Sequence, residues 1–186
     1  MKRPDSAGRV NRQLTLVAAL ALPIMLAGCF GKTSGETATC PGGTATPGLD
    51  VAPQFGPGPG RTRNDVVAAA RILAVKTNCS EESGGVRVDV DVAFSIVRGS
   101  PQLQNTQFNY FVAVVDSQST IWNEARFVLP AHFAGGESFQ ATDDKITIHL
   151  PLKHPAEGSN YGVVAGFQLT PDQIRFNNAQ QTPPAQ

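Results

Sequence analysis

Short stretches in which apolar and polar residues alternate predict an all-β protein. The clearest of them is 86–96, where each second residue from Val86 to Ile96 is apolar. Further predicted strands follow at 107–116, 120–129, 145–152 and 160–169, with turn-forming residues between them. Short strands at this spacing are typical of an immunoglobulin- or fibronectin-like β-sandwich of about seven strands. A helix-start signal near residue 170 adds a short C-terminal helix.

The first strands are expected between residues 49 and 76. Residues 49–52 form a candidate short strand, and the Gly- and Pro-rich segment 54–60 is expected to be a loop. Segment 66–76 has two interpretations, because its three successive alanines favour a helix. It leads, however, through a Glu-Glu-Ser-Gly-Gly turn into the strand at 86–96, and two apolar runs joined by a glycine turn are typical of a hairpin. We therefore interpret 66–76 as a strand.

The later strands differ in how much of their surface they can bury. The strand at 107–116 is apolar on both faces, which is typical of a central strand. In the next strand, Trp122 belongs either to the core or to an exposed contact surface. The core is the favoured placement, because the neighbouring Ile121 can equally face inward.

The chain ends with a helix signal and a polar tail. Thr170, Pro171 and Gln173 have the spacing of an N-cap, a first helical residue and a capping-box partner. The helix is expected to end near Asn178, and the remaining residues, 179–186, are expected to form a disordered tail.

The N-terminus has the layout of a secretory signal peptide. Four basic residues and one acid, Asp5, precede an apolar run at 14–26. That run is shorter than the roughly 20 residues that a membrane-spanning helix needs. A basic lead, a short apolar core and small residues at its end are typical of a signal peptide that is removed on export.

The apolar run ends in Leu26-Ala27-Gly28-Cys29, which resembles the lipobox of bacterial lipoproteins. The resemblance implies cleavage between Gly28 and Cys29, a diacylglyceryl group on Cys29 Sγ and acylation of the new α-amino group. One acyl chain holds a protein only reversibly, whereas two or more make a stable attachment. Phe30 follows Cys29, and the lack of an aspartate at this position resembles lipoproteins that are sent on to the outer membrane. We therefore expect a lipid-anchored envelope protein facing the periplasm; the alternative is an ordinary signal peptide with an incidental cysteine.

Composition limits the rest of the chain. Removing residues 1–28 takes four basic residues and one acid from totals of 15 each, which leaves 158 residues with a net charge of −3. This length suits one domain with its own core. Because no basic field remains to hold a phosphate backbone, we expect no nucleic-acid partner. The Gly-, Thr- and Ser-rich segment 29–48 is expected to be a flexible tether, and the sandwich is expected to occupy 49–178.

Two further cysteines, Cys40 and Cys79, remain after Cys29. In an oxidising compartment an even pair is expected to form a disulfide, which here would pin the far end of the tether to the fold. Closing a loop of about 40 residues would stabilise the fold by roughly 4 kcal/mol in the chain-entropy model. The alternatives are two free thiols or a metal pair, although neither cysteine has a Cys or His neighbour at a ligand spacing.

Candidate nucleophiles and histidines form no recognisable constellation. Gly158-Ser159-Asn160-Tyr161-Gly162 lacks the Gly-x-Ser-x-Gly order of a hydrolase nucleophile elbow and is interpreted as a turn that enters a strand. A zinc site would require His132, His149 and His154 to converge with a carboxylate. Isolated surface histidines are the favoured interpretation.

Paired carboxylates are the remaining candidates for chemistry. Asp89 and Asp91 point the same way from one strand, with Arg87 beside them. Two carboxylates about 7 Å apart can serve acid–base catalysis or hold calcium, but a solvated sheet face is favoured. Asp143-Asp144 is interpreted as a turn before a strand. Pro57 and Pro59 remove N–H donors that a phosphate-binding loop at 56–60 would need. Taken with the other candidates, this leads us to expect no metal, no cofactor and no catalytic residues.

The domain is also similar to a group of uncharacterised lipoproteins from alphaproteobacteria. The similarity is carried by Arg98-Gly99-Ser100-Pro101, Phe108-Asn109-Tyr110-Phe111-Val112-Ala113-Val114-Val115-Asp116 and Gly166-Phe167-Gln168-Leu169-Thr170-Pro171-Asp172-Gln173. It spans most of 40–178 and implies a strand-rich fold without an assigned activity. The leading hypothesis is a non-catalytic envelope module that binds a protein or cell-wall partner. A carrier or sensor of a small periplasmic ligand is the second hypothesis, and a hydrolase is the third.

Overall fold

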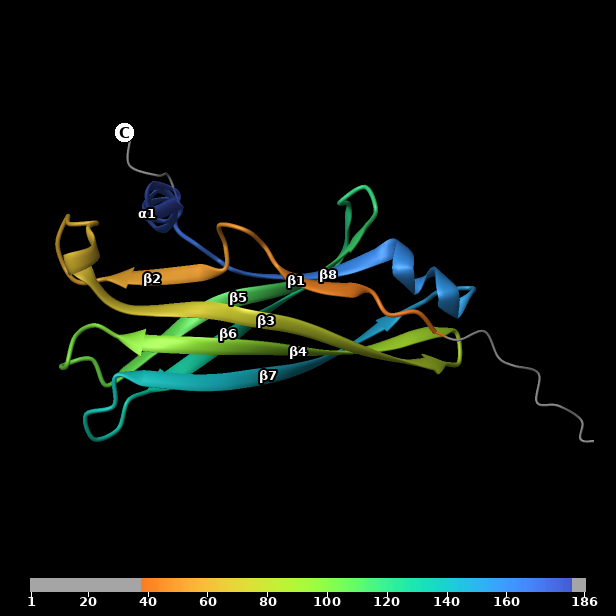
Figure 1. Ribbon diagram of the computed structural model, residues 1–186, viewed down its shortest axis with the longest axis horizontal. Coiled ribbons are helices and arrows are strands. Elements are labelled where there is room, and N and C mark those ends of the chain that lie inside the picture. Colours follow the sequence, from red (N-terminus) through yellow and green to blue (C-terminus); the bar gives the residue numbers. More distant parts are fainter. Residues whose placement is uncertain (1–37, 182–186) are drawn as a thin grey trace, which may run out of the picture. The chain divides into compact units, whose positions relative to one another are not determined.

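A β-sandwich is present in the computed structural model, which describes residues 38–181. These residues form eight strands in two sheets of four, against the expected number of about seven, and one α-helix follows the last strand. Figure 1 shows the two sheets packed face to face. The predicted fold class is therefore confirmed.

The first sheet has the strand order β1–β8–β5–β6. Its strands are β1 (Gly42–Ala45), β8 (Tyr161–Phe167), β5 (Asn105–Asp116) and β6 (Ile121–His132). β1 runs parallel to β8, whereas β8 and β6 both run antiparallel to β5. β5 is thus a central strand, as its two apolar faces predicted.

The second sheet is antiparallel throughout and has the order β2–β3–β4–β7. Its strands are β2 (Val51–Phe55), β3 (Val66–Glu82), β4 (Gly85–Arg98) and β7 (Phe139–Leu150). Two 3₁₀ helices, η1 (Arg63–Asp65) and η2 (Pro155–Asn160), precede β3 and β8. β6 and β7 each form one edge of their sheet.

β1 lies within the segment expected to be a flexible tether, so the folded domain begins before residue 49. Gly43 packs so closely on β3 that a Cβ atom there would lie 2.6 Å from the carbonyl oxygen of Val75. The glycine that suggested flexibility is instead needed for a close approach of two backbones. The predicted Cys40–Cys79 disulfide is present, with the two Cα atoms 5.5 Å apart, and it joins the residues before β1 to β3.

β3 confirms the strand interpretation of 66–76 and is longer than expected. It continues through Cys79 to Glu82, and only Ser83 and Gly84 separate it from β4. Gly84 has φ +90°, a backbone conformation that favours glycine. Ala68 and Ala70 are fully buried in the core, so tertiary packing overrides the helical preference of alanine.

β7 begins six residues before the predicted strand, at Phe139 rather than Lys145. The expectation of a turn at Asp143-Asp144 is therefore wrong, because both residues lie inside β7. Strand pairing with β4 overrides the turn preference of aspartate here, with Asp143 opposite Ala93 and Asp144 opposite Val92.

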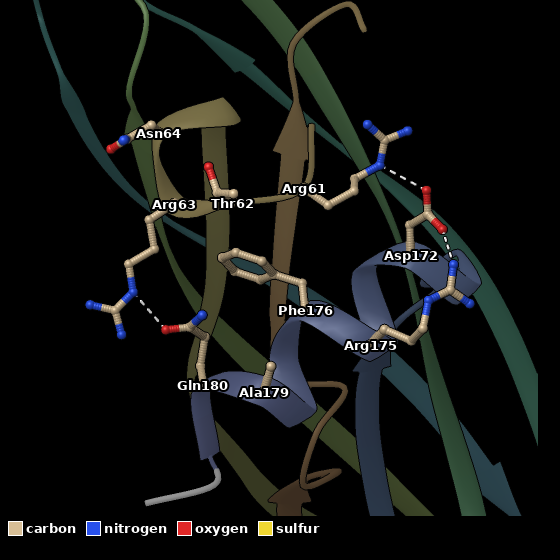
Figure 2. A pocket seen from close by; sticks show the side chains of 9 residues that line it. All are labelled: Arg61, Thr62, Arg63, Asn64, Asp172, Arg175, Phe176, Ala179 and Gln180. Carbon is tan, nitrogen blue, oxygen red and sulfur yellow. Dashed lines mark hydrogen bonds and ion pairs between the residues drawn. The ribbon is translucent and has the colours of Figure 1, made fainter. Parts of the chain in front are cut away.

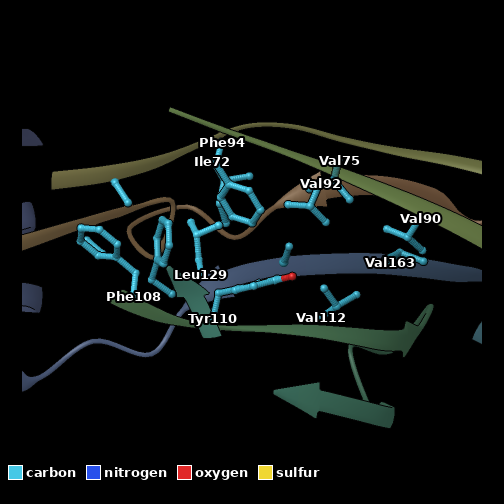
Figure 3. Packing of buried hydrophobic residues seen from close by; sticks show 14 of the residues in the cluster. Ile72, Val75, Val90, Val92, Phe94, Phe108, Tyr110, Val112, Leu129 and Val163 are labelled. Atoms are coloured by element: carbon cyan, nitrogen blue, oxygen red, sulfur yellow. The ribbon is translucent and has the colours of Figure 1, made fainter. Parts of the chain in front are cut away.

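The core lies between the two sheets and is built from the alternating positions of the strands. Figure 3 shows side chains of β3 and β4 facing those of β5, β6 and β8. The labelled residues are Ile72, Val75, Val90, Val92, Phe94, Phe108, Tyr110, Val112, Leu129 and Val163. The rings of Phe94 and Tyr110 meet edge to face across the sandwich with centroids 5.0 Å apart. Such pairs add about 0.5–1.5 kcal/mol to the free energy of burying the rings.

α1 (Pro171–Gln181) confirms the predicted capping box. The Thr170 N–H donates to Gln173 Oε1 at 2.7 Å, and the Gln173 N–H donates to Thr170 Oγ1 at 3.4 Å. The helix runs three residues beyond the expected end at Asn178. It is docked on β2 by the buried Asn177, whose Nδ2 donates to the carbonyl oxygens of Gly48 and Val51.

Candidate functional site

The predicted anchor is not part of the described structure. Gly28 and Cys29 lie outside residues 38–181, as does the predicted tail after Gln181. Among the described residues no helix combines the length and apolar character needed to cross a membrane.

β6 is the most accessible strand of the sandwich. β5 pairs with one of its edges, and no strand within 38–181 pairs with the other. Its first six residues, 121–126, are all exposed, so neither face of this half is covered. Pro130 near its end fits an edge position, because proline cannot donate to a second hydrogen-bonded neighbour.

Exposed apolar side chains gather on β6. Three of the seven large apolar side chains exposed within 38–181 belong to it: Ile121 (58%), Trp122 (50%) and Val128 (53%). The favoured placement of Trp122 in the core is therefore wrong. A β-bulge opposite Val114 shifts the register at this point, and the indole lies edge to face on Tyr161, with ring centroids 5.2 Å apart.

Two opposite charges occupy the middle of the same strand. Arg126 Nε lies 2.8 Å from Glu124 Oε1, and the Arg126 side chain is 71% exposed. Both residues are opposite the outward-facing positions of β5, Ala113 and Phe111, so they lie on the face turned away from the core. An exposed pair of this kind contributes about 0.2–1 kcal/mol to stability, which leaves it available for contacts with other molecules.

A cleft of about 410 Å³ lies between β6 and β7. Its lining comes from both sheets: Val112, Val114, Asn123, Ala125, Phe127, Ile146, Thr147, Ile148 and His149. The inward-facing residues of β7, from Gln140 to Ile148, remain only partly buried. The sandwich is therefore open along the side where β6 and β7 lie.

Tyr110 and Asp144 connect the two sheets across the core. The Tyr110 hydroxyl donates to Asp144 Oδ2 at 2.5 Å, and its ring stacks on Phe127 with centroids 5.2 Å apart. Burial raises the pKa of Tyr110 above its ordinary value, and the hydrogen bond to Asp144 adds to the shift. The phenol thus stays neutral and acts as a hydrogen-bond donor.

A second hollow, of about 580 Å³, lies between α1 and the turn at 61–64 (Figure 2). Arg61 Nε donates to Asp172 Oδ2 at 2.7 Å, and Arg175 contacts the other oxygen of the same carboxylate. On the far side of Phe176, Arg63 Nε donates to Gln180 Oε1 at 2.6 Å. The contacts of Arg61 and Arg63 hold the helix against the turn. They join residues 111 and 117 positions apart, so no local sequence pattern could have indicated them.

The charged face of β4 and β7 is solvated, as the favoured interpretation predicted. Asp89 accepts hydrogen bonds from Thr147 Oγ1 at 2.8 Å and Arg87 Nε at 3.1 Å, and these hold the pKa of Asp89 below its ordinary value. Lys145 Nζ lies 2.7 Å from Asp91 Oδ2, and this contact raises the pKa of Lys145. Each carboxylate is thus engaged with a neighbouring strand rather than with the other.

The histidines do not converge. His132 Nδ1 lies 2.6 Å from Asn105 Oδ1, whereas His149 Nδ1 lies 2.8 Å from Glu82 Oε1. Residues 38–181 contain no group of three or more His, Cys, Asp or Glu side chains placed to hold a metal ion. Ser159 lies at the end of η2, and its hydroxyl donates to the carbonyl oxygen of Ala156 at 3.2 Å.

No family model matches the chain, and no curated protein or solved structure is similar enough to be counted as a relative. The edge of β6 and the cleft beside it are the features that bear most directly on function. The sequence carried two signals for that edge: a proline late in the strand, and opposite charges within an otherwise apolar run.

Proposed function

We propose that the protein is a lipid-anchored, non-catalytic module of the bacterial envelope that binds a protein partner along β6. The observation that carries this proposal is the exposure of β6, which has six consecutive exposed residues and one edge that no strand within residues 38–181 pairs with. A free edge presents a row of backbone N–H and C=O groups to which an extended segment can add as a further strand.

The side chains of β6 support a protein partner over a polysaccharide. Trp122 and Val128 are half exposed at either end of the Glu124 and Arg126 pair, so apolar contacts flank a charged centre. Aromatic residues and arginine are the types that most often dominate binding energy in protein interfaces. An apolar, strand-shaped surface of this kind suits another polypeptide.

The proposed anchor rests on the lipobox resemblance of Leu26-Ala27-Gly28-Cys29. Acylated Cys29 would hold the chain at a membrane, and Phe30 favours the outer membrane facing the periplasm. The disulfide at Cys40 supports export, because structural disulfides persist mainly outside the reducing cytoplasm.

A second candidate function is the carriage of a small apolar ligand in the cleft between β6 and β7. Its volume of about 410 Å³ lies within the range of about 300–1,000 Å³ typical of ligand pockets. We favour the protein partner because the cleft lies along two strand edges. A small molecule recovered in stoichiometric amount from the purified full chain would favour the carrier instead.

Site-specific photo-crosslinking of the full chain in cells tests the proposal. A photoreactive residue at Arg126 should give a discrete protein adduct. The same residue at Arg71 is the matched control, because Arg71 is also an exposed strand arginine but lies on β3, which has a neighbour on each side. Equal labelling from both positions, or no adduct from any position on β6, would contradict the proposal.

A further inference from the structure

We infer that the partner held along β6 is a second copy of this chain, paired antiparallel with the two-fold axis at Ala125. This inference rests on the proposed function, because it names the occupant of the same edge. The pairing would join the two sheets that contain β6 into one sheet continuous across both copies.

The charges of β6 are self-complementary in this arrangement. In an antiparallel pair related by a two-fold axis, the residue on the axis faces its own copy, and residues equally far before and after it face each other. With the axis at Ala125, Glu124 faces Arg126 of the second copy, and Arg126 faces the second Glu124. The intramolecular pair, 2.8 Å between Arg126 Nε and Glu124 Oε1, becomes part of a four-charge cluster.

The charges also select one register. Moving the axis by one residue, to Glu124 or to Arg126, places two glutamates or two arginines directly opposite each other. Like charges directly opposite in a sheet are destabilising, whereas opposite charges stabilise it. Only the axis at Ala125 avoids both clashes among these three registers.

Exposed apolar side chains flank the regular part of this pairing. The regular register covers Asn123 to Phe127, because the β-bulge at Trp122 interrupts it. Trp122 of one copy and Val128 of the other lie at the ends of that stretch, and each is about half exposed in the single chain. Pro130 lies five positions from the axis, beyond these contacts, so its missing N–H affects only the end of the paired stretch.

β7, the edge strand of the second sheet that lies across the cleft from β6, lacks this complementarity. On β7, the register that pairs Asp143 with Lys145 of a second copy has its axis at Asp144 and sets the two Asp144 residues opposite each other. The large exposed apolar residue of β7, Phe139, lies at the first position of the strand. β7 therefore serves as a matched control edge.

The test uses disulfide trapping of the full chain in its native membrane. We expect Ala125→Cys to give a linked species of twice the chain mass under mild oxidation, because residues facing each other across a two-fold axis approach within disulfide range. Ala141→Cys, an exposed alanine on β7, should remain unlinked. Adding Glu124→Arg or Arg126→Glu to Ala125→Cys should lower the linked fraction roughly tenfold through like-charge repulsion.

Co-expression makes the test specific to the register. Copies carrying Glu124→Arg and copies carrying Arg126→Glu restore both opposite-charge contacts only when they pair with each other, so linkage should return as the mixed species alone. Linkage that is indifferent to these charges would overturn the inference. Capture of a different protein at residue 125 would overturn the pairing of two copies while supporting a protein partner along β6. The absence of any adduct along β6 would overturn both the pairing of two copies and the proposed function.

Discussion

Tyr110 shows how a single polar atom can be placed inside an apolar core. The side chain is fully buried, yet its hydroxyl reaches Asp144 on the opposite sheet. A buried hydroxyl without a partner would cost about 1–3 kcal/mol, so the carboxylate offsets the burial of the phenol. The same contact explains why Asp144 lies within β7, where the turn preference of aspartate predicted a loop.

Replacing Tyr110 with Phe tests this contact. We expect Tyr110→Phe to lower the free energy of unfolding by about 2 kcal/mol below pH 10, because the hydrogen bond to a carboxylate is lost. Above the ordinary tyrosine pKa of 10.0, unfolded Tyr110 loses its proton while the folded phenol keeps it, so the wild-type advantage should shrink as the pH rises. Urea unfolding of both proteins at neutral and alkaline pH measures the difference. A difference that stays constant above pH 10 would contradict the assigned cause.

Predictions for single residues were confirmed where the interacting residues are close in sequence or where few residues of the required type exist. The capping box at Thr170 and Gln173 depends on three-residue spacing, and the Cys40–Cys79 bridge follows from the even pair that remains after Cys29. The predicted burial of Trp122 was wrong because it depends on a β-bulge and on whether another strand covers β6. Neither feature can be inferred from the residues next to Trp122 in the sequence.

Among the elements, β1 depends most on a small side chain. Gly43 has the carbonyl of Val75 against the position of its missing Cβ, whereas Gly42 next to it has nothing within 4 Å. Adjacent glycines in one strand therefore have different roles, and only one of them is required by packing.

This difference gives a matched pair of substitutions. Gly43→Ala should destabilise the domain by about 1–3 kcal/mol, because the added methyl group forces β1 away from β3. Gly42→Ala should change the free energy of unfolding by less than about 0.5 kcal/mol. Thermal or chemical unfolding of the two variants measures both effects. Equal destabilisation by the two substitutions would contradict the assignment of the effect to the contact between Gly43 and Val75.

Strand positions were predictable because the alternation of apolar and polar residues shows which face of a strand is buried, and β4 follows it closely. β5 was recognised instead by its apolar residues on both faces. Strand ends and strand partners were less predictable. β1 was not predicted because its composition is Gly-rich, and β7 was predicted too short because its two aspartates favour a turn. The candidate site lies where prediction was weakest, since a free edge is defined by a missing neighbour rather than by a pattern of its own.

The whole domain combines a closed side and an open side. On one side, β1 and the disulfide tie the start of the described chain to β3. On the other side, the outer edges of β6 and β7 have no strand partner among residues 38–181, and the cleft lies between these two strands. Strand order could not be predicted, because it depends on pairings such as β4 with β7, whose residues lie about fifty positions apart. An anchor at Cys29 would concentrate many such domains on one membrane surface, which favours pairing between their β6 edges.

We propose that a lipid at Cys29 holds the domain at a membrane. Intact-mass and peptide mass spectrometry of the membrane-extracted protein tests it most directly. The predicted result is a mature chain that begins at Cys29 and carries a diacylglyceryl group and an N-acyl chain, together with loss of membrane association on Cys29→Ala. A mature N-terminus at any other residue, or an unmodified Cys29 in the membrane fraction, would contradict a lipid anchor at Cys29.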